Sequence, residues 1–587
     1  MLRSLITGQG KFMSNTPNQW DHSVDVLVVG SGNGAMTAAI SANKMAGKDV
    51  LTIEKSAQFG GTSAISGGGV WIPCNRYAQA AGAEDSFDDA KAYLRSVIPE
   101  DQVADNLVDS FLRYGPRMIE FLHNNTQHVR YESLEHYPDY YSANDGAKNG
   151  HRSMEPAKLN ISDLGDEWPD LRHSHHMMWL FDRIAINQVE ASVLMTRAKG
   201  WVSVMAKMLV KYIIDIPWRL KTKRSREIAT GCAGVARLRL AMQDQKLPLW
   251  LNTEMQSLIS DDTGKVVGAK VLKNGKTMTI QARDGVVLAC GGFEHNQSMR
   301  EQYLPKPTNT AWSAGHKGNV GDGIRAGQTL GAATDMMDGA WWCTTISVPK
   351  EPAPRLSIIE KSLPGSVQVN LKGKRIANES QNYMAYLLEL FDTHSEENPN
   401  VPSYQVFDSR YRNKYIVGPI MGNMQPDWAV PKDYFDGQFF FKADSLEDLA
   451  AQTGIDPLGL ADTVSKMNDF AITGKDLDLK RGDSVYDRYY GDPEITPNPC
   501  LAAIDKPPYY AMVVNPGDFG THGGLAINEH AQVLRADGSA INGLYACGNC
   551  ARAILPAYPG PGATLGPAMT FAYQAAKHIT GYDDSAQ

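Results

Sequence analysis

The stretch at residues 24–35, VDVLVVGSGNGA, decides the fold of this chain. A run of apolar and β-branched residues ends at Gly30 and a helix-compatible stretch follows, which predicts a strand, a tight turn and a helix. Gly30 permits the turn, Gly32 lets the backbone approach a diphosphate, and the small Ala35 lets the helix pack close to the strand. The start of the helix offers free N–H groups to the phosphate. The pattern indicates a dinucleotide-binding unit, with an ordinary strand–helix turn as the alternative.

Two further features indicate which dinucleotide is bound. A second apolar strand at residues 49–53 ends in Glu54, at about the right distance for a carboxylate that binds the ribose. After Lys55, the loop at residues 59–69, FGGTSAISGGG, has too many small residues to build a core, and it suits a surface that lies flat against a large planar ligand. A flexible linker is the alternative, but the apolar residues 71–73 follow directly. Together these features indicate FAD rather than NAD, and no histidine lies in the loop to hold a covalent flavin.

Two later strands are also expected to approach the cofactor. The apolar strand at residues 285–289 leads into Gly291 and Gly292, and a strand starting at residue 544 ends in Gly548 and Asn549. Strands that end in glycine again permit close approach to the ligand. The dipole of the last helix, residues 568–579, is expected to face the flavin pyrimidine ring, whose reduced form is anionic. The predicted cofactor-binding residues are Gly30, Gly32, Gly34, Ala35, Glu54, Lys55, Gly61, Thr62, Ser63, Ser66, Gly67, Gly68, Gly291, Gly292, Asp322, Gly548, Asn549, Thr564 and Leu565.

Length and composition limit the architecture. A chain of 587 residues is too long for one compact core. The predicted fold class is α/β: a Rossmann-like FAD-binding domain with an inserted α+β catalytic domain for the substrate. We expect a disordered N-terminal arm at residues 1–22, in which Met13 is an alternative start and which lacks a signal-peptide core. The cofactor domain then comprises residues 23–295 and 516–587, and the substrate domain residues 296–515.

Charge and cysteine content exclude several classes of protein. The formal net charge is −8, so no nucleic-acid partner is expected. The seven cysteines do not form a disulfide framework, which favours a reducing compartment such as the cytoplasm. No metal site is predicted, since no cluster of His, Cys and Asp has ligand spacing. Cys547 and Cys550 form a CxxC, for which we favour packing of small residues over a redox dithiol. No apolar run approaches the length of a membrane span.

Residues 199–227 combine an apolar stripe with basic residues. Most of the basic residues follow Pro217 and Trp218. Such a segment suits a helix lying in a membrane interface, here peripherally on the inner membrane. An amphipathic helix packed on its own protein is an equal alternative. The stripe contains Val202, Met205, Met208, Leu209, Tyr212, Ile213 and Ile216.

The remaining candidates for chemistry are tyrosines near glycine loops. A phenol donates a hydrogen bond to a carbonyl oxygen, and a phenolate takes a proton from carbon. A backbone N–H in a loop of Gly and Pro shares the negative charge that develops on the carbonyl. Tyr558 and Gly562, held by alternating prolines, fit that oxyanion role. These features are compatible with a flavin-dependent desaturation next to a ketone.

From about residue 24 to residue 577 the chain resembles the 3-ketosteroid 1-dehydrogenases, within the fumarate-reductase-like flavoproteins. The matching motifs are GSGNGA, EKSAQFGGTSAISGGGVWIP, YPDYY, RIANESQNY, YDRYYGDP, GTHGGL and AYPGPGATLGPAMTF. The resemblance implies FAD and oxidation of the C1–C2 bond of a 3-ketosteroid in bacterial steroid degradation. By motif position, Tyr558 and the Gly562 N–H polarise the C3 carbonyl, Tyr383 removes the C2 proton, and Tyr140 activates Tyr383. N5 of FAD takes the C1 hydride, and the electron acceptor, a quinone or another compound, stays open.

Three departures from the family pattern affect the shape of the substrate site. Pro559 replaces a small residue, Asn382 replaces a common Pro, and His522 replaces a common Lys. The rival readings are a 3-ketosteroid 4-dehydrogenase, which oxidises C4–C5, and a non-catalytic flavin-binding protein. A soluble fumarate reductase is a remote rival, because it needs arginine and histidine where this chain has tyrosines.

Overall fold

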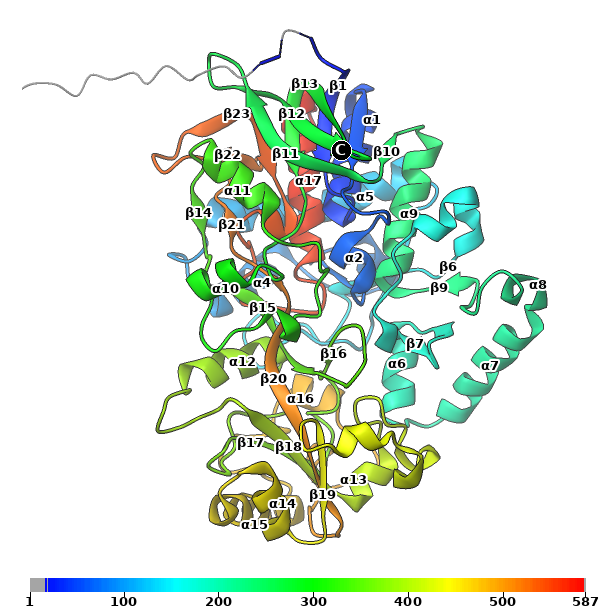
Figure 1. Cartoon of the computed structure of the whole chain (residues 1–587), viewed down its shortest axis with the longest axis vertical. Helices are drawn as coiled ribbons and strands as arrows, with labels where there is room; N and C mark the ends of the chain where they lie inside the picture. Colours follow the sequence, from blue (N-terminus) through cyan, green and yellow to red (C-terminus); the bar gives the residue numbers. More distant parts are fainter. Residues whose placement is uncertain (1–15, 18, 585–587) are drawn as a thin grey trace, which may run out of the picture.

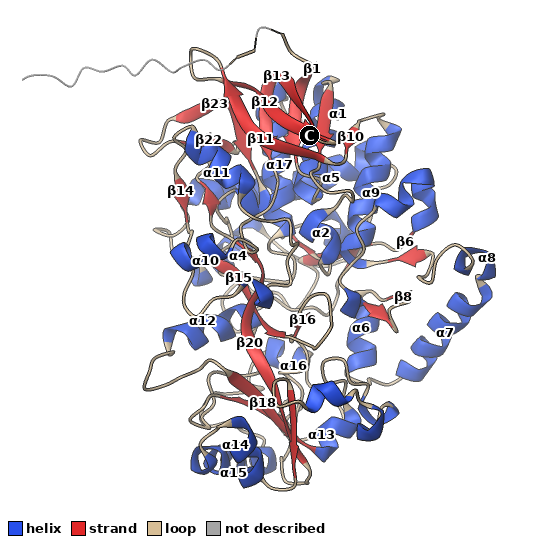
Figure 2. Ribbon diagram, viewed as in Figure 1, coloured by secondary structure: helices blue, strands red, loops and turns tan. Residues whose placement is uncertain are grey.

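The computed structural model describes residues 16–17 and 19–584. Most of the predicted N-terminal arm, residues 1–15 and 18, lies outside the described residues. Two sheets organise the rest of the molecule, one at each end in Figures 1 and 2. The strands β15 and β20 run between them through the middle.

The first sheet is built on β1 (His22–Val29). β1 pairs in parallel with β2 (Val50–Ile53) on one side and β13 (Lys276–Leu288) on the other, with Val26 beside Val50 and Gly285. Both faces of these strands are covered, which explains their nearly continuous apolar sequence. The other members are β10 (Leu249–Trp250), β11 (Thr253–Ser260), β12 (Val266–Lys273), β22 (Gln532–Leu534) and β23 (Ala540–Ala546).

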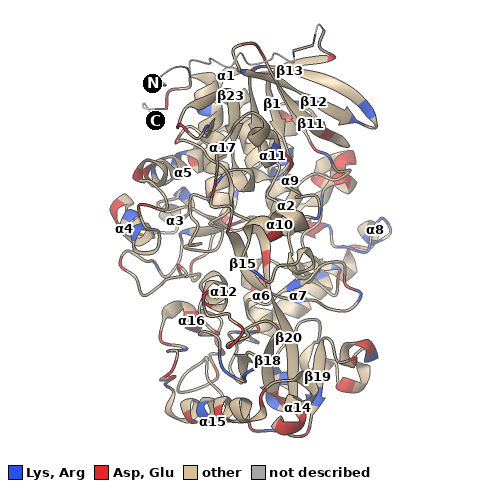
Figure 3. Cartoon of the chain, turned by 60° about the vertical axis from the view of Figure 1, so that its left-hand side comes forward, with Lys and Arg blue, Asp and Glu red and all other residues tan. Residues whose placement is uncertain are grey.

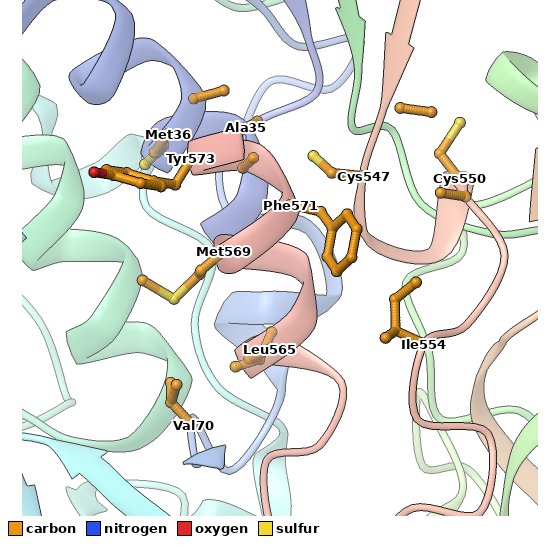
Figure 4. Packing of buried hydrophobic residues seen from close by; sticks show 14 of the residues in the cluster. Ala35, Met36, Val70, Cys547, Cys550, Ile554, Leu565, Met569, Phe571 and Tyr573 are labelled. Carbon is orange, nitrogen blue, oxygen red and sulfur yellow. The ribbon is translucent and has the colours of Figure 1, made fainter. Parts of the chain in front are cut away.

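Two helices from opposite ends of the chain pack against each other at this sheet. They are α1 (Asn33–Ala46), which follows β1, and α17 (Leu565–Thr580), the last helix. Figure 4 shows Ala35 and Met36 of α1 beside Met569 and Tyr573 of α17. All four side chains are fully or almost fully buried. A Cβ on Gly34 of α1 would lie 3.1 Å from the Ala568 carbonyl oxygen, so the small residues of α1 permit this close contact.

The second sheet has the strand order β16-β15-β20-β18-β17, with β19 also paired to β20. Its long central strand β20 (Tyr509–Thr521) continues from this sheet toward the first one (Figure 1). The domain limit that the sequence suggested, between residues 515 and 516, falls inside β20. The other strands are β15 (Ala340–Ile346), β16 (Arg355–Leu356), β17 (Ser366–Val369), β18 (Ser403–Asp408) and β19 (Phe440–Ala443).

The segment at residues 199–227 contains α7 (Trp201–Ile214) and the short α8 (Ile216–Arg219), at the side of the molecule in Figure 1. The single apolar stripe of the sequence divides into two faces. One face packs with α6 (Gln188–Met195) in a small core that includes Met208. The stripe residues Val202 and Ile213 are instead 60% and 56% accessible, as are their neighbours Val210 (57%) and Ile214 (69%). No helix within the described residues is long and apolar enough to cross a membrane.

Candidate active site

The glycine loops converge on one large cavity between the two sheets. The predicted cofactor residues line it, except Ala35 and Gly292. Ala35 is buried in the contact between α1 and α17, and a Cβ on Gly292 would fall 2.2 Å from Thr521 Oγ1, so Gly292 packs against β20. The roles of the lining residues toward a cofactor stay predictions.

The backbone comes very close to itself where β1 ends. Gly30 has φ = 113°, and a Cβ on it would lie 2.2 Å from the carbonyl oxygen of Ala289. Only glycine combines this conformation with this approach. The next loop is fixed by Ser31, whose hydroxyl group accepts the Gly60 N–H at 2.9 Å and donates to Glu54 Oε2 at 2.5 Å. The carboxylate expected to bind ribose is therefore held in one orientation.

The sequence did not reveal how the cofactor residues bind one another. Lys55 and Asp322 form an ion pair that joins two distant segments at the cavity. Thr62 Oγ1 accepts hydrogen bonds from the His316 N–H and the Asn319 amide, each at 3.0 Å. These polar contacts close the wall of the cavity around the second glycine loop, α2 (Gly61–Ile65) and the residues after it.

The start of α17 tests whether the cavity fits FAD. Thr564 and Leu565, where α17 begins, both line the cavity. The helix presents its positive dipole end there, which suits an electron-rich ring system. These residues therefore fit the flavin ring that the sequence predicted.

The three predicted catalytic tyrosines meet at the cavity. The Tyr140 hydroxyl donates a hydrogen bond of 2.8 Å to the Tyr383 hydroxyl. The ring of Tyr558 lies 5.6 Å from that of Tyr383 and 5.7 Å from that of Tyr140, measured between centroids. All three side chains are at least 94% buried. Residues 140, 383 and 558, far apart in sequence, thus form one cluster of phenols.

Backbone geometry holds two of these groups. Tyr558 has φ = 56°, a left-handed conformation that is rare for a residue other than glycine and often marks functional sites. Gly562 has φ = 103°, and a Cβ on it would lie 2.4 Å from backbone atoms of Gly69. The Gly562 amide is close enough to Tyr558 to lower the pKa of its hydroxyl group, although burial is the larger effect and raises that pKa overall. The predicted oxyanion pair is therefore brought together.

Burial decides the protonation of the cluster. It raises the pKa values of Tyr140 and Tyr383 well above the usual value for a phenol. The hydrogen bond from Tyr140 acts in the opposite direction on the pKa of Tyr383, because it stabilises the phenolate. At neutral pH the phenols are therefore protonated.

An ionic cluster that the sequence did not predict holds the loop before Tyr383. Lys361 is buried, and its ammonium group donates hydrogen bonds of 2.6 Å to the carbonyl oxygens of Glu379 and Gln381. The Glu379 carboxylate pairs with Arg375 at 2.6 Å and with Arg481 at 3.3 Å. Tyr383 then begins α12 (Tyr383–Asp392). The sequence alone does not predict that these Lys and Arg side chains are buried, because their carbonyl and carboxylate partners are brought together only by the fold.

Asn382 departs from the family pattern for a local reason. Its side chain caps α12 by accepting the Ala385 N–H at 2.8 Å.

His522 also has a defined environment: its ring is 5.0 Å from that of Trp341, and burial lowers the pKa of His522 to about 4. Trp341 in turn donates to Asn549 Oδ1 at 3.0 Å. His522 is therefore neutral where a lysine would carry a charge.

The cysteines pair differently from the CxxC of the sequence. The sulfur of Cys550 lies 3.8 Å from that of Cys290, at the end of β13. Cys547 is buried nearby, and a Cβ on Gly34 would lie 3.2 Å from its sulfur. Cys547 thus fills space beneath the α1 turn, as expected of a small packing residue.

Comparison with known proteins places this geometry in a class. The FAD binding domain family matches residues 25–565. The chain is 38% identical to the 3-oxosteroid 1-dehydrogenase of Mycobacterium tuberculosis, over 94% of this chain and 98% of the relative. It is 36% identical to the 4-oxocyclohexanecarboxylate 2-dehydrogenase of Sinomonas cyclohexanicum, over 98% and 96% of the two chains.

A solved structure agrees over the whole fold. The 3-ketosteroid Δ1-dehydrogenase of Sterolibacterium denitrificans, solved with 1,4-androstadiene-3,17-dione, superposes with a TM-score of 0.91 at 44% identity, covering 96% of this chain and 100% of that one. The glycine-lined cavity and these matches define an FAD-dependent oxidoreductase, which confirms the predicted cofactor and fold class. The chain belongs to the 3-ketosteroid 1-dehydrogenase family.

Proposed function

We propose that the protein catalyses the 1,2-desaturation of 3-ketosteroids, with Tyr140, Tyr383, Tyr558 and Gly562 as the catalytic groups. The observation that carries the proposal is the Tyr140–Tyr383 hydrogen bond beside the Tyr558–Gly562 pair. A proton on C2 becomes acidic when the neighbouring ketone is polarised, so base and oxyanion donors must lie on the same ring of the substrate. Bound FAD supplies the acceptor for the hydride that leaves C1.

Each of these residues has a separate role in the proposed reaction. The Tyr558 hydroxyl and the Gly562 N–H donate to the C3 oxygen and stabilise the negative charge of the enolate. Tyr383 accepts the C2 proton, while the hydrogen bond from Tyr140 stabilises the phenolate form of Tyr383. Burial of all three phenols keeps water away from this charge.

The cavity disfavours a small ketone that carries a carboxylate. Among the described residues that line it, Lys55 is the only Lys or Arg, and it is paired with Asp322. A carboxylate substrate would meet no other fixed cation there, whereas the apolar nucleus of a steroid needs none. This favours a steroid substrate over 4-oxocyclohexanecarboxylate, the compound in the name of the Sinomonas relative.

Product analysis tests the reaction and its position. The enzyme is incubated with 5α-androstane-3,17-dione and an artificial electron acceptor, a substrate that permits both C1–C2 and C4–C5 oxidation. We expect the 1-ene product. Formation of the 4-ene would support the 4-dehydrogenase reading, and the absence of any product with this substrate and with androst-4-ene-3,17-dione would refute the proposal.

We also propose that the segment at residues 199–227 contacts an anionic membrane surface peripherally. Besides Val210 and Ile214, the apolar side chains of Ile216 and Leu220 are 57% and 85% exposed. Figure 3 shows the basic residues at α8 and the loop after it. Lys211, Arg224 and Arg226 pair with carboxylates, whereas Lys207, Lys221 and Lys223 have no such ion pair among the described residues. Trp218 does not contribute, because it is buried against Trp168.

Vesicle sedimentation tests the membrane contact. Each Lys or Arg near an anionic surface contributes about 1 kcal/mol, and salt screens this attraction. Binding to phosphatidylglycerol vesicles should be strong at low salt and be lost when Ile213 and Ile214 are both changed to Glu. A matched control changes Leu458 and Leu477, which are also exposed but lie elsewhere, to Glu. Equal loss in both variants would refute a specific contact.

A further inference from the structure

Trp341 lies between the predicted cofactor residues and the catalytic tyrosines. Its indole N–H donates a hydrogen bond of 3.0 Å to Asn549 Oδ1, and Asn549 is half-buried and lines the cavity. The indole also meets the ring of Tyr558 edge to face, with 5.3 Å between the centroids and 68° between the planes. Trp341 is 3% exposed and is not among the residues that line the large cavity. It therefore contacts one group of the predicted flavin site and one of the oxyanion pair from behind.

A bulge in the second sheet places Trp341 at this position. Residues 340–342 of β15 lie opposite residues 518–521 of β20, so β20 has one extra residue beside Trp341. Such bulges re-aim side chains and are common next to active sites. The bulge includes Gly520, which has φ = 147° and on which a Cβ would lie 2.6 Å from Asn549 Nδ2. Glycine at this point thus permits Asn549 to approach the indole.

The hydrogen bond to Trp341 decides which end of the Asn549 amide is left for a ligand. A side-chain amide has one oxygen, which accepts, and one nitrogen, which donates two hydrogen bonds. The indole N–H can only donate, so it binds the oxygen and leaves the amide nitrogen to donate to a bound group. The ring of His522, 5.0 Å from the indole, packs against Trp341 and restricts its movement.

We propose that Trp341 is a positioning residue, which orients the Asn549 amide so that its nitrogen donates to FAD and which holds the ring of Tyr558 in place. This inference rests on the proposed function. The hydride leaves C1 and the oxyanion forms at C3 of the same substrate ring, so the flavin site and Tyr558 must keep a fixed separation. One side chain that contacts both Asn549 and Tyr558 sets that separation.

Two substitutions separate the N–H group from the ring. Trp341→Phe keeps an aromatic ring near Tyr558 but leaves the Asn549 oxygen without its donor. The FAD dissociation constant, measured from the flavin released on dilution of the holoenzyme, should rise roughly 5- to 100-fold. Trp341→Leu also removes the ring contact. It should lower kcat with androst-4-ene-3,17-dione about 5- to 10-fold below that of Trp341→Phe, with KM changed less than about 3-fold.

Paired substitutions test each contact. Asn549→Ala should weaken FAD binding by itself, and Trp341→Phe added to it should then have little further effect, because the amide it orients is gone. In the same way, Trp341→Leu should lower kcat less in Tyr558→Phe than in wild type, since the hydroxyl group that it positions is absent. Full additivity in both pairs overturns the inference. If Tyr558→Phe alone leaves kcat unchanged, the proposed function is refuted instead.

A matched control is Trp179→Phe. Trp179 is also buried, donates its N–H to the Ser174 carbonyl oxygen at 3.3 Å and packs against the ring of His173 at 5.5 Å. This control should keep the wild-type FAD dissociation constant and kcat; an equal change in both tryptophan variants overturns the inference. If the thermal midpoint shows that Trp341→Phe is not folded, Asn549→Asp decides, because a carboxylate still accepts from the indole but cannot donate. Wild-type FAD binding in Asn549→Asp would overturn the inference, and weaker binding is the expected result.

Discussion

Tyr140 and Tyr383 share a hydrogen bond of 2.8 Å although they belong to different parts of the fold. Tyr383 begins α12, whereas the backbone N–H of Tyr140 donates to the Pro559 carbonyl oxygen at 2.9 Å, next to Tyr558. The proposed base, Tyr383, therefore comes from the substrate part of the fold. Its activating donor, Tyr140, and the oxyanion donor, Tyr558, come from two segments that lie side by side in the cofactor part.

Removing the base should have a larger effect than removing its activator. Tyr383→Phe should lose most of kcat with the FAD spectrum intact, and Tyr140→Phe should lose less, since it removes only one hydrogen bond to the phenolate. In deuterium oxide the wild type should wash a C2 hydrogen out of the steroid, and Tyr383→Phe should not. Near wild-type turnover in Tyr383→Phe would exclude it as the base.

The rate should rise with pH. Burial raises the pKa of Tyr383 well above 10, so below that pKa the phenolate fraction, and with it kcat/KM, increases as the pH rises from 7 to 10. Tyr140→Phe removes the donor that lowers the pKa of Tyr383, so its profile should shift to higher pH. A pH-independent kcat/KM would contradict proton removal by Tyr383. Tyr558→Phe, which loses no base, should keep the wild-type slope.

Loss of an oxyanion donor should reduce kcat more than binding. Tyr558→Phe removes one of two proposed donors to the C3 oxygen, and such a loss typically costs roughly 10²–10³ in rate. Steady-state kinetics separate this from packing, because a tyrosine that only lines the pocket would change KM and leave kcat nearly unchanged.

The buried lysine behind the base should affect kcat through position. Lys361→Met leaves the carbonyl groups of Glu379 and Gln381 without their donor, at a cost of roughly 1–3 kcal/mol for each buried group. We expect kcat to fall about 10-fold or more with KM little changed. Arg412→Met is the matched control, since Arg412 is also buried and donates to two carbonyl groups, those of Gly422 and Gln425. If both variants lose stability and kcat equally, Lys361 has no special role at Tyr383.

The turn after β1 should be essential for the flavin. Gly30→Ala forces a Cβ to within 2.2 Å of the Ala289 carbonyl oxygen, so the protein should purify without its yellow colour. Gly47→Ala is the control, because Gly47 also has a positive φ, 63°, but open space around it. In wild type, acid precipitation should release FAD into the supernatant. Flavin that stays in the pellet would indicate a covalent link.

The motifs of the sequence located the glycine loops because each loop depends on local geometry, whereas Tyr140 and Tyr383 were located only by the resemblance of their motifs to a known family. Gly30 and Gly562 are needed where backbone atoms nearly touch, and such positions tolerate only one residue type. Lys361 was not found, because its importance lies in partners that the fold brings from residues 379–381. The same holds for Cys550, whose neighbour is Cys290 rather than Cys547.

The helix at residues 201–214 was predictable, but its exposed face was not. In the sequence, the apolar residues of this helix recur with a period of 3.6 residues. In the fold, only some of them pack against α6, and the others are exposed. Burial of Trp218 is likewise a consequence of Trp168, which lies fifty residues earlier in the chain.

The continuous strand β20 has a consequence for exchanging parts between relatives. It belongs to the second sheet at Tyr509 and lines the cofactor cavity at Phe519, so no flexible joint separates the two parts along this strand. A chimaera that took residues 296–515 from one relative and the rest from another would be cut within a paired strand. A small error in its register would move Tyr383 away from Tyr140. The cofactor part and the substrate part would therefore have to come from the same relative.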